Sequence, residues 1–329
     1  MGADGPGSGR TGQGETSALH PMLRSMLDAA AALPPVYEVP LADARAAALT
    51  RFRTGVPPDP VATVENRTID GPTGPLAVRI YRPTGVPLPA PVTVFFHGGG
   101  FVICSLDTHD AMCRQICHRA GTVVVSVDYR MAPENPFPAA PDDCLAATRW
   151  AAREAAGFGG DPARLAVAGD SAGGNLAAVT ALRARDENGP PIKAQLLVYP
   201  VTDHYGTGHM SYTERSTGFG LTGDTMRWFW DMYLGVEPGD AATHGAHPHA
   251  SPLRAERFAG LPPAYVVTAG FDPLHDEGDA FARQLRDAGV PVELARYADM
   301  NHGFFNWVGV IDRSTEAMDA ACAWLRRTL

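Results

Sequence analysis

One serine lies between glycines where an apolar run ends, in the segment Gly169-Asp170-Ser171-Ala172-Gly173. The residues before this segment are typical of a strand, and those from residue 174 onward are typical of a helix. On such a turn, a serine in a Gly-x-Ser-x-Gly pattern points its hydroxyl away from the sheet, and the free amides of the helix stabilise negative charge beside it. Ser171 is therefore our candidate nucleophile, with an ordinary glycine-rich turn as the alternative.

A general base and a carboxylate that orients it are expected in two later loops. Asp272 and His302 each come a few residues after a predicted strand. The order serine, aspartate, histidine along the chain is the one found where the nucleophile sits on a strand-to-helix turn. We therefore predict a triad of Ser171, Asp272 and His302. Asp276 is a competing acid, but it is expected to lie in the next helix and to cap that helix's N-terminus.

Three consecutive glycines follow another predicted strand, in the segment His97-Gly98-Gly99-Gly100-Phe101. Glycines leave their backbone amides unobstructed, and loops of this kind supply oxyanion donors in lipases and esterases. We predict that the amides of Gly98, Gly99 and Ala172 form an oxyanion hole. His97 is expected to brace this loop by hydrogen bonding rather than to act as the base.

The elements that must position these residues alternate in type along the chain. Two predicted helices and an antiparallel hairpin come first, and strands then alternate with helices to the C-terminus. This alternation predicts an α/β fold, with a mostly parallel sheet, helices on both faces and ligands bound beyond the carboxyl ends of the strands. The predicted strands are residues 61–70, 76–81, 92–96, 122–127, 164–168, 194–198, 265–268 and 292–296, and the predicted helices are residues 18–33, 41–52, 107–120, 139–156, 171–186, 225–234, 276–288 and 314–327.

The length of 329 residues is near the upper limit for a single core, and no interior stretch is typical of a linker between equal halves. We predict a disordered tail at residues 1–17 and cap helices at residues 18–52. The catalytic domain is predicted at residues 53–329, with a cap insertion at about residues 203–236.

The predicted insertion carries an amphipathic helix with an aromatic face. The residues on this face are Met226, Phe229, Trp230, Tyr233 and Leu234. They either pack the cap onto the body or line a substrate pocket. For the pocket we predict Tyr205, Phe219 and Trp230, together with Cys104 near the glycine loop, where the alternative is a small buried hydrophobic side chain.

Composition limits the partners and the location. The net charge of −9 argues against nucleic acid or anionic membrane partners. No window approaches the roughly 18 apolar residues of a membrane helix, and residues 1–17 lack the apolar core of a secretory signal. The five cysteines form no Cys-x-x-Cys pair, so reduced buried thiols and a cytoplasmic location are expected. His244, His247 and His249 are interrupted by Pro248 with no cysteine nearby, so we expect a solvated loop and no metal.

Together these motifs resemble those of the bacterial hormone-sensitive-lipase-like carboxylesterases, in the subgroup with the sequence Gly-Asp-Ser-Ala-Gly. The resemblance runs from about residue 60 to the C-terminus and includes the two glycine motifs, Asp128-Tyr129-Arg130-Met131-Ala132-Pro133-Glu134, Asp272-Pro273-Leu274 and His302-Gly303-Phe304. It implies an eight-stranded α/β-hydrolase sheet, a cap built from the N-terminal helices and the insertion, and hydrolysis of short-chain esters without a cofactor. Cys104 stands where the family usually has glycine, and Asn135 stands where histidine or serine is common. Because Cys104 lies close to the oxyanion loop in sequence, it puts the substrate preference in question.

We predict a serine carboxylesterase that hydrolyses short- to medium-chain esters by two-step acyl transfer through Ser171. Bulky cap aromatics and the family resemblance together favour acyl chains of about four to eight carbons. An amidase or arylformamidase on the same fold is the alternative, because both reactions transfer an acyl group to serine. A non-catalytic receptor is disfavoured, because plant hormone receptors that resemble the family have lost the triad histidine and His302 is present. The expected partner is a small-molecule ester, bound by a monomer or a homodimer, with no nucleic acid and no membrane.

Overall fold

The computed structural model describes residues 18–51, 53–235 and 245–329, so the predicted tail at residues 1–17 lies outside the described residues. Within them, eight strands form one sheet in the order β1-β2-β4-β3-β5-β6-β7-β8. The strands are β1 Thr63–Gly71, β2 Gly74–Arg82, β3 Ala90–Phe96, β4 Val123–Val127, β5 Gly160–Asp170, β6 Ile192–Val198, β7 Ala264–Phe271 and β8 Val292–Asn301. The hairpin β1–β2 and the pair β2–β4 are antiparallel, whereas the other neighbours are parallel. The predicted mostly parallel sheet is therefore confirmed.

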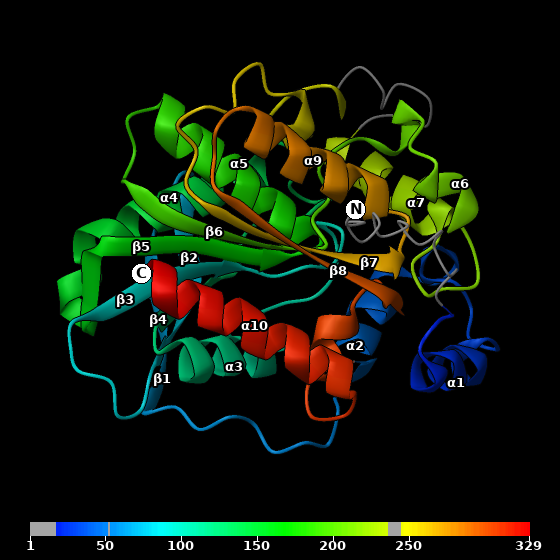
Figure 1. Ribbon diagram of the computed structural model, residues 1–329, viewed down its shortest axis with the longest axis horizontal. Coiled ribbons are helices and arrows are strands. Elements are labelled where there is room, and N and C mark those ends of the chain that lie inside the picture. The colour runs from blue at the N-terminus through cyan, green and yellow to red at the C-terminus, as the bar shows by residue number, and fades with distance from the viewer. Residues whose placement is uncertain (1–17, 52, 236–244) are drawn as a thin grey trace, which may run out of the picture.

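Helices cover both faces of this sheet (Figure 1). On one face lie α4 Ala139–Glu154, α5 Ala172–Asp186 and α9 His275–Asp287, and on the other lie α3 Asp110–Ala120 and α10 Asp312–Thr328. Short 3-10 helices, η1 Val36–Glu38, η2 Ala155–Phe158, η3 Tyr205–Thr207, η4 Pro252–Arg254 and η5 Phe304–Trp307, lie in the connections. The two-layered helical cover explains why the central strands are almost continuously apolar, since neither of their faces meets water.

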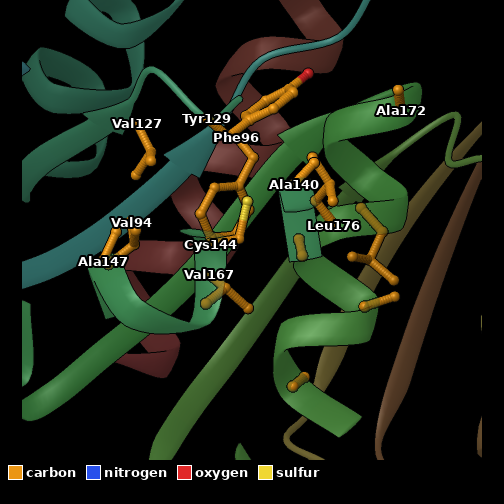
Figure 2. Packing of buried hydrophobic residues seen from close by; sticks show 14 of the residues in the cluster. Val94, Phe96, Val127, Tyr129, Ala140, Cys144, Ala147, Val167, Ala172 and Leu176 are labelled. Carbon is orange, nitrogen blue, oxygen red and sulfur yellow. The ribbon is translucent and has the colours of Figure 1, made fainter. Parts of the chain in front are cut away.

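The buried side chains separate into two cores, because successive residues of a strand point to opposite faces. Val94 and Phe96 of β3 belong to one core, whereas Phe95 between them belongs to the other. In the first core, Val94 and Phe96 lie with Val167 of β5 and Leu176 of α5 (Figure 2). The strand that leads into the glycine loop and the helix that follows Ser171 are thus fixed by the same packing.

Four further helices gather beyond the carboxyl ends of β7 and β8 (Figure 1). They are α1 Pro21–Ala30, α2 Leu41–Arg51, α6 Ser211–Glu214 and α7 Gly223–Leu234. The side chain of Thr222 accepts a hydrogen bond from the Thr225 amide and so caps α7 at its N-terminus. Among the described residues, no helix combines the length and apolarity needed to cross a bilayer.

Arg45 joins α2 to the loops at this end of the sheet. Its guanidinium donates to the carbonyl oxygens of Val102 at 2.9 Å and Ala132 at 3.0 Å, and it makes two hydrogen bonds of 2.7 Å to the Glu134 carboxylate. Val102 follows the glycine loop closely, and its amide donates to the Gly99 carbonyl. The N-terminal helices are therefore attached directly to the chain that surrounds the predicted site.

Candidate active site

The predicted nucleophile sits on a strained turn between β5 and α5. Ser171 has φ +56° and ψ −121°, a backbone conformation that residues other than glycine rarely adopt. Neighbouring backbone comes very close here, since a Cβ atom at Gly169 would overlap the carbonyl of Gly173, and one at Gly173 would overlap the carbonyl of Phe96. The glycines on either side of Ser171 are thus required by close approach, and they let the turn fit against β3.

Three side chains form a continuous hydrogen-bonded line at the strand ends. Ser171 Oγ lies 2.9 Å from His302 Nε2, and His302 Nδ1 lies 2.7 Å from Asp272 Oδ2. Because an ionised carboxylate only accepts hydrogen bonds, Nδ1 carries a proton and Nε2 of the neutral ring is left to accept from the serine hydroxyl. Asp272 is fully buried, and its other oxygen accepts from the Leu274 amide at 2.9 Å. The arrangement can therefore abstract the serine proton.

Asp272 and His302 lie nearer to the ends of their strands than the sequence predicts. Strand β7 continues to Phe271 and β8 to Asn301, so Asp272 and His302 each follow directly on the last residue of a strand. Two parallel neighbouring strands end side by side, which accounts for the contact between residues 30 positions apart.

The competing acid, Asp276, has a different partner. Its carboxylate accepts from the Ser211 amide at 2.9 Å, and the Ser211 hydroxyl donates to the Pro273 carbonyl at 2.6 Å. The prediction that Asp276 caps its own helix is wrong, because α9 has no side-chain cap and the donor comes from α6 instead. Asp276 thus ties α6 to the loop that carries Asp272.

The glycine loop differs from the prediction by one residue. The Gly98 amide donates to Asp170 Oδ1 at 2.9 Å, so its single N–H is occupied and the prediction that Gly98 is an oxyanion donor is wrong. In the part of the chain that the structure describes, the amides of Gly99, Gly100 and Ala172 donate to no protein acceptor. Gly99 and Gly100 have φ of +108° and +60°, conformations that residues with a side chain rarely adopt. The free donors are therefore Gly99, Gly100 and Ala172.

His97 braces this loop, as its place in the sequence predicts. It is fully buried, its Nδ1 lies 2.8 Å from the Gly98 carbonyl oxygen, and the Tyr129 hydroxyl donates to the His97 carbonyl at 2.8 Å. The two rings stack with their centroids 4.3 Å apart. Burial lowers the pKa of His97 to about 3, so the ring is neutral near neutral pH and binds a proton too weakly to be an effective general base.

Two residues of this site were not given a role from the sequence. These are Asp170, which immediately precedes the nucleophile, and His109, which immediately precedes α3. Both are buried, and Asp170 Oδ1 lies 3.1 Å from His109 Nε2. The signal available was a carboxylate placed directly between an apolar strand and the nucleophile, since a charge in such a position needs a buried partner.

The residues predicted to line the pocket differ in how deeply they are buried. Trp230 is only 1% exposed, and its ring packs beside the stacked rings of Phe101 and Tyr233, with centroids 6.2 Å and 5.8 Å away. This corrects the prediction that Trp230 lines the pocket, because the ring joins α7 to the body. Tyr205 and Phe219 are half-buried, and the Phe219 carbonyl accepts from the side chain of Asn301, the residue before His302.

Cys104 lies against the glycine loop. It has φ +74°, and a Cβ atom at Gly99 would come within 2.9 Å of its own Cβ. Burial raises the pKa of Cys104 to about 12, so the thiol stays protonated and is a poor nucleophile.

All five cysteines are free and buried, which gives a direct test of this packing. We expect a chromogenic disulfide reagent at about pH 8 to modify fewer than about one thiol per chain within minutes, because buried protonated thiols react slowly. In denaturant, the same reagent should modify all five. Rapid loss of one thiol in the native protein, prevented by Cys104→Ala, would show that the Cys104 side chain is accessible.

The histidine cluster shows no arrangement for a metal. The ring centroids of His247 and His249 lie 4.9 Å apart, and His247 Nδ1 accepts from the His249 amide. The predicted third member, His244, lies outside the described residues. Among the described residues, no group of three or more potential ligands could hold a metal ion.

The chain is similar in sequence and in fold to known hydrolases. A protein-family model described as the alpha/beta hydrolase fold matches residues 93–306. Esterase LipI of Mycobacterium tuberculosis is 43% identical over 319 residues, which cover 96% of this chain and 97% of LipI. Carboxylesterase NlhH of the same species is 42% identical over 317 residues, covering 94% and 96% of the two chains. Among solved structures, an esterase of Pyrobaculum calidifontis superimposes with a TM-score of 0.85 at 40% identity, covering 94% of this chain and 98% of its own.

Proposed function

This chain belongs to the α/β-hydrolase fold family, and from that membership we propose that it is a serine carboxylesterase acting on short- to medium-chain esters through an acyl-enzyme intermediate. The observation that carries the proposal is the hydrogen-bonded line from Asp272 through His302 to Ser171. The esterases and carboxylesterases among its relatives support the same reaction.

In the proposed first half-reaction, Ser171 Oγ attacks the ester carbonyl carbon while His302 Nε2 takes the hydroxyl proton. Asp272 keeps the proton on Nδ1 and stabilises the imidazolium that forms. The carbonyl oxygen becomes an oxyanion, for which the free amides of Gly99, Gly100 and Ala172 are the proposed donors. When the tetrahedral intermediate collapses, the carbon–oxygen bond to the alcohol breaks and the alcohol leaves with the proton from His302.

The second half-reaction repeats these steps with water. His302 takes a proton from a water molecule, which attacks the acyl carbon of the ester formed with Ser171. Collapse of the second intermediate returns the proton to Ser171 Oγ and releases the carboxylic acid. No cofactor takes part in either half, since proton transfer and amide donors account for every charge that develops.

We further propose that residues 18–52 and about 203–236 act as a cap over this site. The gathering of α1, α2, α6 and α7 beyond the strand ends supports this proposal (Figure 1), and so do the contacts of Arg45 and Asp276 described above. A cap of this kind limits the length of the acyl chain, because each further methylene gains about 0.8 kcal/mol only while it can still be buried.

The test is the dependence of kcat/KM on acyl length, from p-nitrophenyl acetate to palmitate, with and without an oil–water interface. We expect a maximum at about four to eight carbons and no activation by the interface. A maximum at laurate or longer, or strong interfacial activation, would favour a lipase. The anilide of the best acyl group distinguishes an amidase, which would hydrolyse it at a rate comparable to the ester.

We also propose that the protein works in the cytoplasm on a small soluble ester. The five unpaired cysteines support a reducing compartment, and the net charge of −9 disfavours anionic partners. Light scattering on the purified chain would decide between a monomer and a homodimer, both of which are compatible with the sequence.

A further inference from the structure

A single buried oxygen connects three parts of the site. Asp170 immediately precedes the nucleophile, and its Oδ1 accepts from the Gly98 amide at 2.9 Å. The same oxygen lies 3.1 Å from Nε2 of His109, the residue that precedes α3. The side chains of His109 and Asp170 are only 2% and 5% exposed. The nucleophile turn, the glycine loop and the start of α3 therefore meet at one carboxylate.

The hydrogen bonds around His109 determine its protonation state. The Thr108 hydroxyl accepts from the Ser105 amide at 2.9 Å and donates its only proton to the Ser105 carbonyl at 2.8 Å. At 2.8 Å from His109 Nδ1, the same hydroxyl can then act only as an acceptor, so Nδ1 carries a proton. The Gly98 amide lies 3.4 Å from Nε2, but its shorter hydrogen bond, of 2.9 Å, goes to Asp170 Oδ1. Nε2 itself lies 3.1 Å from that same carboxylate oxygen, which only accepts, so we assign a proton to Nε2 as well. His109 is therefore an imidazolium.

The groups around the pair are compatible with this assignment. The titratable side chains that face Asp170 or His109 are His97, Cys104, Cys113, Tyr129, Tyr199 and His302. The His97 ring is neutral, and burial raises the pKa of both cysteines and both tyrosines, so these groups add no charge near neutral pH. Although burial alone would raise the pKa of Asp170, the opposite charge of His109 and the hydrogen bonds to the carboxylate lower it.

We propose that His109 and Asp170 form a buried imidazolium–carboxylate pair that sets the position of the oxyanion amides relative to Ser171. The inference rests on the proposed acyl transfer and makes both residues positioning residues. Asp170 and Ser171 are adjacent in the chain, and Gly98 directly precedes the donor pair Gly99-Gly100. One charge-assisted hydrogen bond thus fixes the separation between nucleophile and donors, and such bonds are shorter and stronger than neutral ones.

The fit around this hydrogen bond is tight. A Cβ atom at Gly98 would lie 2.6 Å from Asp170 Oδ2, so the loop can approach the carboxylate only with glycine at this position. If Asp170 were neutral, the His109 imidazolium would be buried without a counter-ion. If His109 were neutral, the Asp170 carboxylate would be buried without one. Either single loss is costly, because an unpaired buried charge is worse than no charge at all.

The first experiment is a double-mutant cycle with Asp170→Asn and His109→Gln, measured with p-nitrophenyl butyrate. We expect each single variant to lower kcat about ten- to a hundred-fold with KM changed less than about three-fold, because the displaced amides bind the oxyanion and not the ground state. The double variant should lose less than the product of the two single losses, because either single exchange already breaks the pair. Losses that simply multiply, or single variants with the kcat of the wild type, would overturn the proposal.

A matched control separates positioning from general destabilisation. Asp143 is also a buried carboxylate, 1% exposed, but its partner is Arg130 at 2.8 Å. Asp143→Asn should lower the unfolding temperature as much as Asp170→Asn does, yet keep kcat within about three-fold of the wild type. An equal loss of kcat in both variants would attribute the effect of Asp170 to stability alone and contradict the proposal.

The second experiment observes the proton directly and does not depend on turnover. Nitrogen NMR of histidine-labelled protein at about pH 8, above the ordinary histidine pKa of about 6.5, should show one ring with both nitrogens protonated. That signal should be absent in His109→Gln and should change to that of a neutral ring in Asp170→Asn. A neutral His109 in the wild type would overturn the ion pair, whereas a wild type that hydrolyses no ester would refute the proposed function and leave the NMR result to decide the pair.

Discussion

Ser171→Ala should leave a folded protein whose kcat is lower by about five to six orders of magnitude. The exchange removes only the attacking oxygen, since the side chain is 8% exposed and alanine fits the same turn. The measurement is turnover of p-nitrophenyl butyrate, with circular dichroism and thermal unfolding to verify the fold. Ser314→Ala is the matched control, because Ser314 is fully buried in α10 and should keep the activity of the wild type. Substantial turnover by the Ser171 variant would remove this residue from the role of nucleophile.

Asp272→Asn should lower kcat about ten-thousand-fold at neutral pH with little change in the fold. An asparagine amide that faces His302 Nδ1 donates a hydrogen bond, so the ring loses its proton at Nδ1 and presents the wrong tautomer to Ser171. Asp276→Asn should lower kcat less than about ten-fold, because that carboxylate only accepts from the Ser211 amide. The comparison requires both variants at the same pH and in the same ester assay, and the opposite ranking would assign the role of triad acid to Asp276.

The sheet and the site were accessible from the sequence for one physical reason. A strand that is covered on both faces has a short, continuously apolar sequence, and in this fold the catalytic side chains follow directly after such strands. Ser171, Asp272 and His302 each lie immediately beyond a strand end, so locating the strands brought the three residues together without knowledge of the long-range contacts.

Features that depend on side chains distant in sequence were not accessible in this way. Of the three successive glycine amides, that of Gly98 is occupied because it donates to Asp170, a residue 72 positions later in the chain. The partner of Asp276 is Ser211, 65 residues earlier, so its local signal for a helix cap was misleading. Trp230 lies on a helix face that could pack or bind, and the spacing of its neighbours is the same in both cases.

The backbone at Ser171 also bears on how such a chain changes over generations. Holding a residue other than glycine at φ +56° costs about 1–3 kcal/mol of stability, and glycine would adopt that conformation without strain. A lineage released from the need to turn over esters, as a receptor would be, gains stability by exchanging this serine for glycine. Selection for folding alone would favour that exchange, so a serine held in this conformation is itself a sign that the reaction is still under selection.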